Sequence, residues 1–127
     1  MNHKIGSEVA YQVRHELKQS PQSYIKFMTD GILLKEMSSD PLLLAYGVII
    51  IDEAHERKMN TDILIGLLSK LILVRYKMSQ ENKCNPLRLI IMSATLRVSD
   101  FQNEKLFNFK VPILKVEGKM FPVTIFH

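Results

Sequence analysis

The chain has 127 residues, 46% hydrophobic and 24% charged, so it can bury a core and is not a disordered segment. Its one cysteine, Cys84, excludes an internal disulfide framework and favours a reducing compartment such as the cytosol or the nucleus. The net charge of +4 permits binding to nucleic acid, although scattered charges are more typical of a solvated surface.

The first part of the chain is predicted to form two strands and a helix. Apolar alternation predicts a strand from Val9 to Val13, and a turn at Pro21 separates it from a second strand within Tyr24 to Met28. Thr29 or Asp30 can then cap a helix from Ile32 to Met37.

The middle of the chain is predicted to be strand, helix, strand. Val48 to Ile51 is a run of four β-branched residues, typical of a strand buried on both faces. Asn60 and Thr61 are candidate caps of a helix that reaches about Lys77, because apolar residues then recur at helical spacing. Leu87 to Met92 is a second apolar strand.

The end of the chain is predicted to contain a helix from Ser99 to Phe107 and strands from Ile113 to Val116 and from Phe121 to Phe126. Alternation of strands and helices indicates an α/β fold, a parallel sheet with helices on both faces. The longest apolar stretch, Leu42 to Ile51, is far short of the roughly 20 residues of a membrane span, and the first residues do not resemble a signal peptide. We therefore expect no membrane association.

Two polar clusters follow the buried strands, where an open α/β sheet binds its ligand. Asp52 and Glu53 come directly after one strand; such carboxylates suit Mg²⁺ and can position water for phosphoryl transfer, but they can equally cap the next segment. His55 is a hydrogen-bonding relay or a surface histidine, since no second ligand supports zinc. Ser93 and Thr95 offer hydroxyls at the next strand end, or cap a helix.

These clusters resemble the motifs of DEAH-box helicases. Asp52-Glu53-Ala54-His55 is the signature tetrapeptide, and Ser93-Ala94-Thr95 is similar to the next motif in order. Thr29-Asp30-Gly31 resembles the preceding motif, and Val9 to Glu16 resembles the stretch before it, with His15 and Ala10 in place of the usual Phe and Gly. Four motifs in order are far more specific than one.

The resemblance implies a role for each matching residue. Asp52 and Glu53 would hold Mg²⁺, largely through water, with Glu53 polarising the attacking water and His55 linking the ATP site to a second motor domain. Ser93 and Thr95 would couple hydrolysis to strand movement. Thr29, Asp30 and Arg14 would lie on the RNA side, where contacts position a strand without reading its sequence.

The resemblance also implies the place of the chain in a larger protein. Residues 1–127 correspond to the C-terminal portion of a first RecA-like motor domain that uses ATP, and the phosphate-binding P-loop is not among them: the only Gly-Lys, Gly118-Lys119, lacks the pattern. The expected partners are RNA, a second RecA-like domain, C-terminal domains and a protein activator. The isolated chain is expected to be inactive and, with unpaired strands, able to form a homodimer.

Three interpretations remain open on the sequence. The chain is part of an ATP-dependent RNA helicase, or a non-catalytic RecA-like module that binds RNA or protein, or an unrelated α/β protein with an accidental tetrapeptide. Ser93 to Phe101 is most similar to DEAH-box helicases of small-subunit ribosome assembly, which predicts a nuclear, nucleolar protein.

Overall fold

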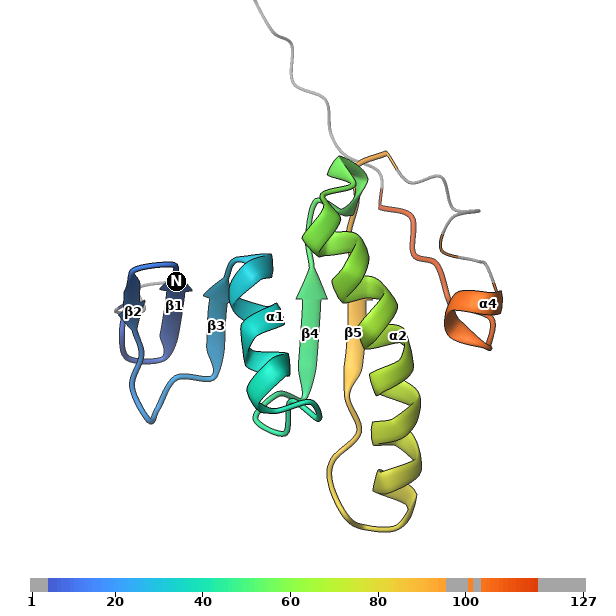
Figure 1. The fold of residues 1–127 in the computed structure, drawn as a ribbon, viewed down its shortest axis with the longest axis horizontal. Coiled ribbons are helices and arrows are strands. Elements are labelled where there is room, and N and C mark those ends of the chain that lie inside the picture. Colours follow the sequence, from blue (N-terminus) through green and yellow to red (C-terminus); the bar gives the residue numbers. More distant parts are fainter. Residues whose placement is uncertain (1–4, 96–100, 102–103, 117–127) are drawn as a thin grey trace, which may run out of the picture.

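The computed structural model describes residues 5–95, 101 and 104–116 of the chain. Its strands form two small sheets, and two long helices pack beside them (Figure 1). The strands are β1 (Val9–Val13), β2 (Glu16–Lys18), β3 (Ile25–Met28), β4 (Val48–Ile51) and β5 (Arg88–Ile91). The helices are α1 (Asp30–Ser39), the short 3-10 turn η1 (Ala54–Glu56), α2 (Met59–Gln80) and α4 (Glu104–Phe107).

The first sheet has the strand order β2-β1-β3. β1 runs parallel to β3, with Val9 opposite Ile25, and antiparallel to β2, which the sequence did not predict. The second sheet consists of β4 and β5, paired in parallel with Ile49 opposite Leu89. The expectation of a single parallel sheet is therefore wrong for the described residues, although the α/β class is confirmed.

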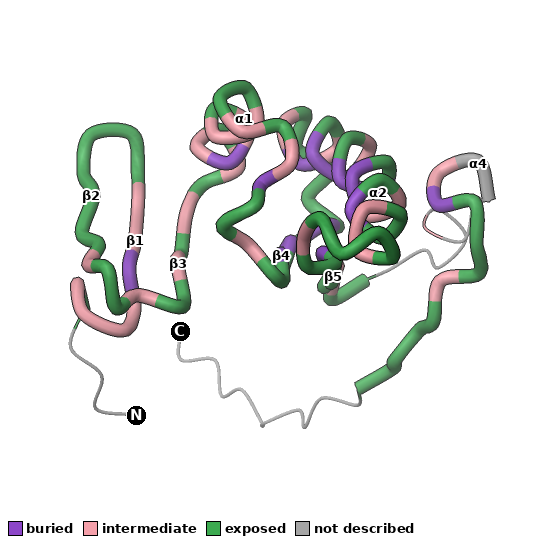
Figure 2. The backbone as a smooth tube through the Cα atoms, turned by 90° about the horizontal axis from the view of Figure 1, so that it is seen from below, coloured by how far each residue is buried: buried purple, intermediate pink, exposed green. Residues whose placement is uncertain are grey.

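Both long helices lie on the same side of β4 and β5 (Figure 2). α1 lies in the connection from β3 to β4, and α2 lies in the crossover between the parallel strands β4 and β5, a connection that is right-handed as a rule. Ile49 and Ile51 point towards them and are buried, whereas Val48 and Ile50 are exposed on the opposite face. The predictions of helices on both faces and of a strand buried on both faces are thus wrong within the described part of the chain.

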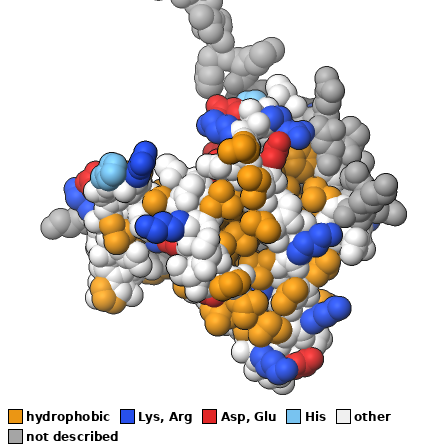
Figure 3. All heavy atoms as spheres, viewed as in Figure 1, with side chains coloured by type: hydrophobic (Ala, Val, Ile, Leu, Met, Phe, Trp, Pro, Cys, Tyr) orange, Lys and Arg blue, Asp and Glu red, His pale blue; other side chains and the backbone are white. Residues whose placement is uncertain are grey.

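The core gathers around α2. Leu64 and Leu68 are fully buried on this helix and pack with residues of α1, β4 and the connecting loops. The cluster comprises Leu33, Leu43, Ile49, Ile51, Ala54, Leu64, Ile65, Leu68, Leu71, Leu87 and Phe107. α2 is also apolar on its outer side, where Ile63, Leu67 and Val74 are exposed. Figure 3 shows hydrophobic side chains gathered over this helix layer. No described helix is long and apolar enough to cross a bilayer.

A buried arginine joins the two loops that lead into β4 and β5. The Arg75 guanidinium, 1% exposed, donates to the carbonyls of Leu42, Leu43, Tyr46 and Asn85 at 2.6–3.2 Å. These carbonyls lie in the loops before β4 and β5. Arg75 therefore holds the starts of both strands, at the ends opposite to the polar clusters.

Other element predictions differ at their ends. α2 begins at Met59 with Lys58 as its N-cap, so neither Asn60 nor Thr61 caps it. Residues 113–116 form no strand, because they are exposed and no neighbouring strand among the described residues pairs with them. Much of the predicted helix from Ser99, and the strand from Phe121, lie outside the described residues.

Candidate functional site

The two polar clusters that the sequence predicted lie together where β4 and β5 end. Backbone hydrogen bonds join them: the Met92 amide donates to the Ile51 carbonyl at 2.8 Å, and the Ala54 amide donates to the Met92 carbonyl at 3.1 Å. Because the strands are parallel, Asp52 and Glu53 leave one strand beside the point where Ser93 leaves the other. The adjacency of the DEAH and SAT segments follows from this pairing.

The turn after β4 has an unusual backbone. Glu53 (φ 53°) and Arg57 (φ 51°) both adopt the left-handed conformation, which costs a residue with a side chain about 1–2 kcal/mol. The short helix η1 lies between them, and its first residue, Ala54, is fully buried. The turn therefore holds its polar side chains outwards above a buried alanine.

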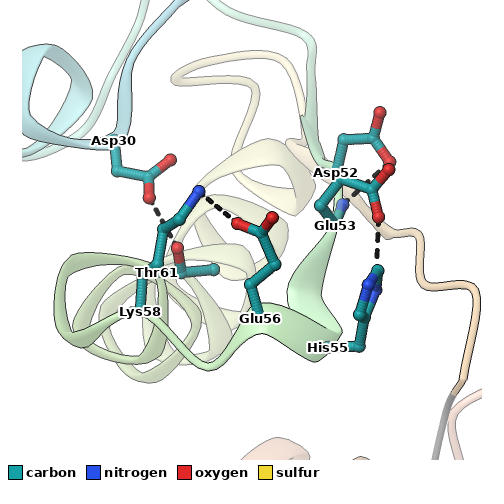
Figure 4. A network of polar contacts seen from close by, with 7 residues as sticks. All are labelled: Asp30, Asp52, Glu53, His55, Glu56, Lys58 and Thr61. Atoms are coloured by element: carbon teal, nitrogen blue, oxygen red, sulfur yellow. Dashed lines mark hydrogen bonds and ion pairs between the residues drawn. The ribbon is translucent and has the colours of Figure 1, made fainter.

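The side chains of the turn contact one another (Figure 4). Asp52 Oδ1 accepts a hydrogen bond from the Glu53 amide at 2.8 Å, and Glu53 Oε2 lies 3.2 Å from His55 Nδ1. Glu56 forms an ion pair with Lys58, which lowers the pKa of Glu56 and raises that of Lys58. Both carboxylates of the acidic pair remain exposed, so they are accessible to a ligand.

The acidic pair fits a magnesium ion bound mainly through water. Mg²⁺ in nucleotide sites commonly takes one or two carboxylates and keeps several waters. Asp52 has one carboxylate oxygen outside its hydrogen bond with the Glu53 amide. The described residues contain no group of three acidic, histidine or cysteine side chains able to enclose a metal by themselves. Any ion held here by the described residues would therefore complete its coordination with water or a bound ligand.

Ser93 carries a polar atom that the described structure leaves unsatisfied. Its Oγ is buried and has no hydrogen-bond partner among the described residues. Buried hydroxyls are normally hydrogen-bonded, so this group is able to accept or donate a bond to water, a ligand or another segment. Thr95, two residues further on, is exposed.

The predicted RNA-side residues follow the strands of the first sheet. Thr29 lies between β3 and α1, and its side chain makes no capping bond although it occupies the N-cap position. Arg14 is exposed in the turn after β1, at the same edge, since Gln12 pairs with Met28. Asp30 contacts the other long helix, because its carboxylate accepts a hydrogen bond from Thr61 Oγ1 of α2 at 2.5 Å.

Thr61 makes a contact in this region that the sequence did not predict. It was expected to cap α2, but it lies in the first turn of the helix and is only 4% exposed. Its partner is 31 residues earlier in the chain, so no local pattern could have revealed the contact.

Comparison with known proteins identifies the family. The chain is 58% identical to the RNA helicase kurz of Drosophila melanogaster and 56% identical to DHX37 of Homo sapiens, which cover 94% and 92% of it. It is 47% identical to the ATP-dependent RNA helicase DEAH13 of Arabidopsis thaliana, over 96% of its length. No family model matches the chain. With its TDG, DEAH and SAT motifs in this order along the sequence, the chain belongs to the DEAH-box RNA helicase family.

The match covers only a small part of these relatives. The chain spans about a tenth of the length of the curated proteins it matches: 10% of kurz and DHX37 and 11% of DEAH13.

Proposed function

We propose that this chain is the C-terminal portion of the first RecA-like motor domain of an ATP-dependent RNA helicase. The observation that carries the proposal is the pairing of β4 and β5, which brings Asp52 and Glu53 next to the SAT segment at one sheet edge. Two acidic groups at a strand end, beside hydroxyl-bearing residues, suit a nucleotide site that works by positioning and charge stabilisation.

A larger protein is supported by the apolar side chains that both outer surfaces expose. Val48, Ile50 and Ile90 are 45%, 55% and 46% exposed on the sheet side, and Ile63 and Leu67 are similarly exposed on α2. Extended apolar surfaces of this kind normally pack against further structure. We assign that structure to the remainder of a longer chain, including a second RecA-like domain and C-terminal domains; isolated copies would pair through the same surfaces as a homodimer.

The proposed roles at the site follow from its geometry. Asp52 would hold Mg²⁺ largely through water, with Glu53 beside it to orient the attacking water. Bound Mg²⁺ would supply charge stabilisation for the phosphates of ATP. The contact from Glu53 to His55 Nδ1 limits the freedom of the Glu53 carboxylate. Through this contact His55 would link the ATP site to a second motor domain.

Ser93 and Thr95 would couple hydrolysis to the movement of the RNA strand. The unsatisfied Ser93 hydroxyl supports this role, because it can gain a partner when the site closes. Thr29 and Arg14 would contact RNA phosphates at the edge of the first sheet. Such binding would be sequence-independent and sensitive to salt.

The cellular process is proposed from the residues after the SAT motif. The similarity of Ser93–Phe101 to helicases of small-subunit ribosome assembly favours that process and a nucleolar location. A protein activator would be expected for such an enzyme.

A non-catalytic module that binds RNA or protein is the second candidate function. It is favoured by one observation: the 127 residues contain no G-x-x-x-x-G-K-[ST] sequence to cradle phosphates. For the same reason we expect the isolated chain not to hydrolyse ATP at a useful rate.

ATP hydrolysis with and without RNA separates the two candidates. The longer protein should show RNA-stimulated turnover, and Glu53→Gln should lower it by about 10²-fold or more, because the water would lose its carboxylate. Glu81→Gln, which changes an exposed carboxylate at the far end of α2, is the matched control and should behave as the unsubstituted protein. Absence of turnover in the unsubstituted longer protein would refute the helicase and favour the binding module.

A further inference from the structure

A part-buried hydrogen bond joins the first turns of α1 and α2. Thr61 Oγ1 donates a hydrogen bond to Asp30 Oδ2 at 2.5 Å, and Thr61 is 4% exposed (Figure 4). α1 follows β3 after a single residue, and α2 follows the DEAH turn after β4, so the bond links the starts of two helices that follow strands of different sheets. A hydrogen bond to a carboxylate is among the stronger kinds in proteins.

The geometry engages Asp30 within the protein and makes it poorly suited to contact an RNA phosphate. One of its carboxylate oxygens is already bonded to Thr61, and a carboxylate repels the phosphates that Thr29 and Arg14 would bind. Lys58, at the N-cap of α2, has its pKa raised first by Glu56 and additionally by Asp30 and Glu53. This lysine therefore lies within electrostatic reach of both the TDG segment and the DEAH turn.

The contact lies between the proposed RNA-binding edge and the proposed ATP site. On one side of it is Thr29, the residue next to Asp30, at the edge assigned to RNA. On the other side, Arg57 in the DEAH turn bonds through Nε to Asp62, the residue next to Thr61. A shift of α1 when RNA binds would thus reach the DEAH turn through side chains that are adjacent in the first turn of α2.

We propose that the Asp30–Thr61 hydrogen bond makes these two side chains positioning residues that transmit RNA binding to the ATP site. The inference rests on the proposed helicase function and deepens it. Neither residue touches the reacting atoms; Thr61 holds the first turn of α2, and so the DEAH turn, in register with the TDG segment.

The test compares RNA-stimulated with RNA-free ATP hydrolysis in the longer protein. Thr61→Val keeps the shape of the side chain and removes its hydroxyl, and it should lower the stimulation factor about tenfold, within the usual range of coupling between sites. RNA-free turnover should change less than about twofold, because the acidic pair is untouched. Thr61→Ser, which retains the hydroxyl, should restore stimulation.

Two further variants separate coupling from simple destabilisation. Ser69→Ala removes another buried hydroxyl of α2, whose bond to the Gly66 carbonyl stays within the helix, and it should leave the stimulation factor unchanged. Asp30→Ala combined with Thr61→Val should be no worse than the more damaging single variant, because both changes remove the same bond.

The outcomes distinguish this inference from the proposed function. Unchanged stimulation in Thr61→Val, or an equal loss in Ser69→Ala, would overturn the coupling role while the helicase assignment stands. Additive losses in the double variant would overturn it as well. Absence of RNA-stimulated turnover in the unsubstituted protein would overturn both.

Discussion

Replacement of Arg75 by methionine is expected to be among the most destabilising single changes in this domain. Methionine keeps much of the length and apolar volume of the side chain but offers no donors. The substitution removes five hydrogen bonds from the guanidinium to four backbone carbonyls. It also releases Leu43, whose backbone is in the left-handed conformation (φ 47°) with its side chain buried.

The size of the effect follows from opposing contributions. At about 1.5–3 kcal/mol for each hydrogen bond to a charged group, five bonds set an upper bound of about 7.5–15 kcal/mol. Removal of a buried charge recovers a desolvation cost of several kcal/mol. Most of these bonds are only partly buried, so water can replace some of the lost donors. We expect a net loss of about 3–5 kcal/mol.

Urea unfolding measures this loss directly. With a slope of about 2 kcal/mol per M, the midpoint of Arg75→Met should fall by roughly 1.5–2.5 M. Arg75→Lys keeps the charge but not the planar guanidinium group, so its midpoint should lie between those of the unsubstituted protein and Arg75→Met. Lys77→Met is the matched control, since it replaces an exposed basic residue on the same helix. A midpoint for Arg75→Met close to that of Lys77→Met would refute the role assigned to the guanidinium.

Two other variants test the structure away from the acidic pair. Burial and the hydrogen bond from Tyr46 to Glu36 raise the pKa of Tyr46 above its ordinary value of 10.0. Tyr46 therefore loses its proton at a lower pH in the unfolded chain than in the folded chain. Its contribution to stability is complete below about pH 10 and should decline as the pH rises further. In urea unfolding between about pH 8 and pH 11, Tyr46→Phe should flatten this decline and Tyr76→Phe should not; an unaltered slope would contradict the assignment. Gly31→Ala should stabilise the chain by about 0.5–1 kcal/mol in urea, because a Cβ there would meet Asn60 Nδ2 at an ordinary 3.8 Å; a clear destabilisation would show that α1 needs the glycine.

Several elements could be predicted because their signal is local. The strand from Val9 to Val13 and the strand from Val48 to Ile51 have the bounds that their apolar patterns indicated. The long helix was also foreseen, though it begins at Met59 and ends at Gln80. β2 was missed because its three residues are all exposed, and such a short strand has no apolar pattern of its own.

The site was predictable in its residues but only partly in its connections. Two parallel strands that end in polar clusters must bring those clusters to one edge, and the pairing of β4 with β5 confirms this for the DEAH and SAT segments. Their roles in catalysis and coupling stay predictions. The left-handed backbone at Glu53 had no sequence signal, because no glycine marks it.

By itself, the sequence determined the family, the α/β class and the positions of the acidic pair and of the TDG and SAT segments along the chain. These properties depend on residue type and spacing. Only the tertiary structure decided that Arg75 is buried among backbone carbonyls, that one face of β4 is covered while the other is exposed, and that Thr61 bonds to Asp30. Each of these depends on segments that are distant in the sequence, and a contact between distant segments leaves no periodic pattern in either of them.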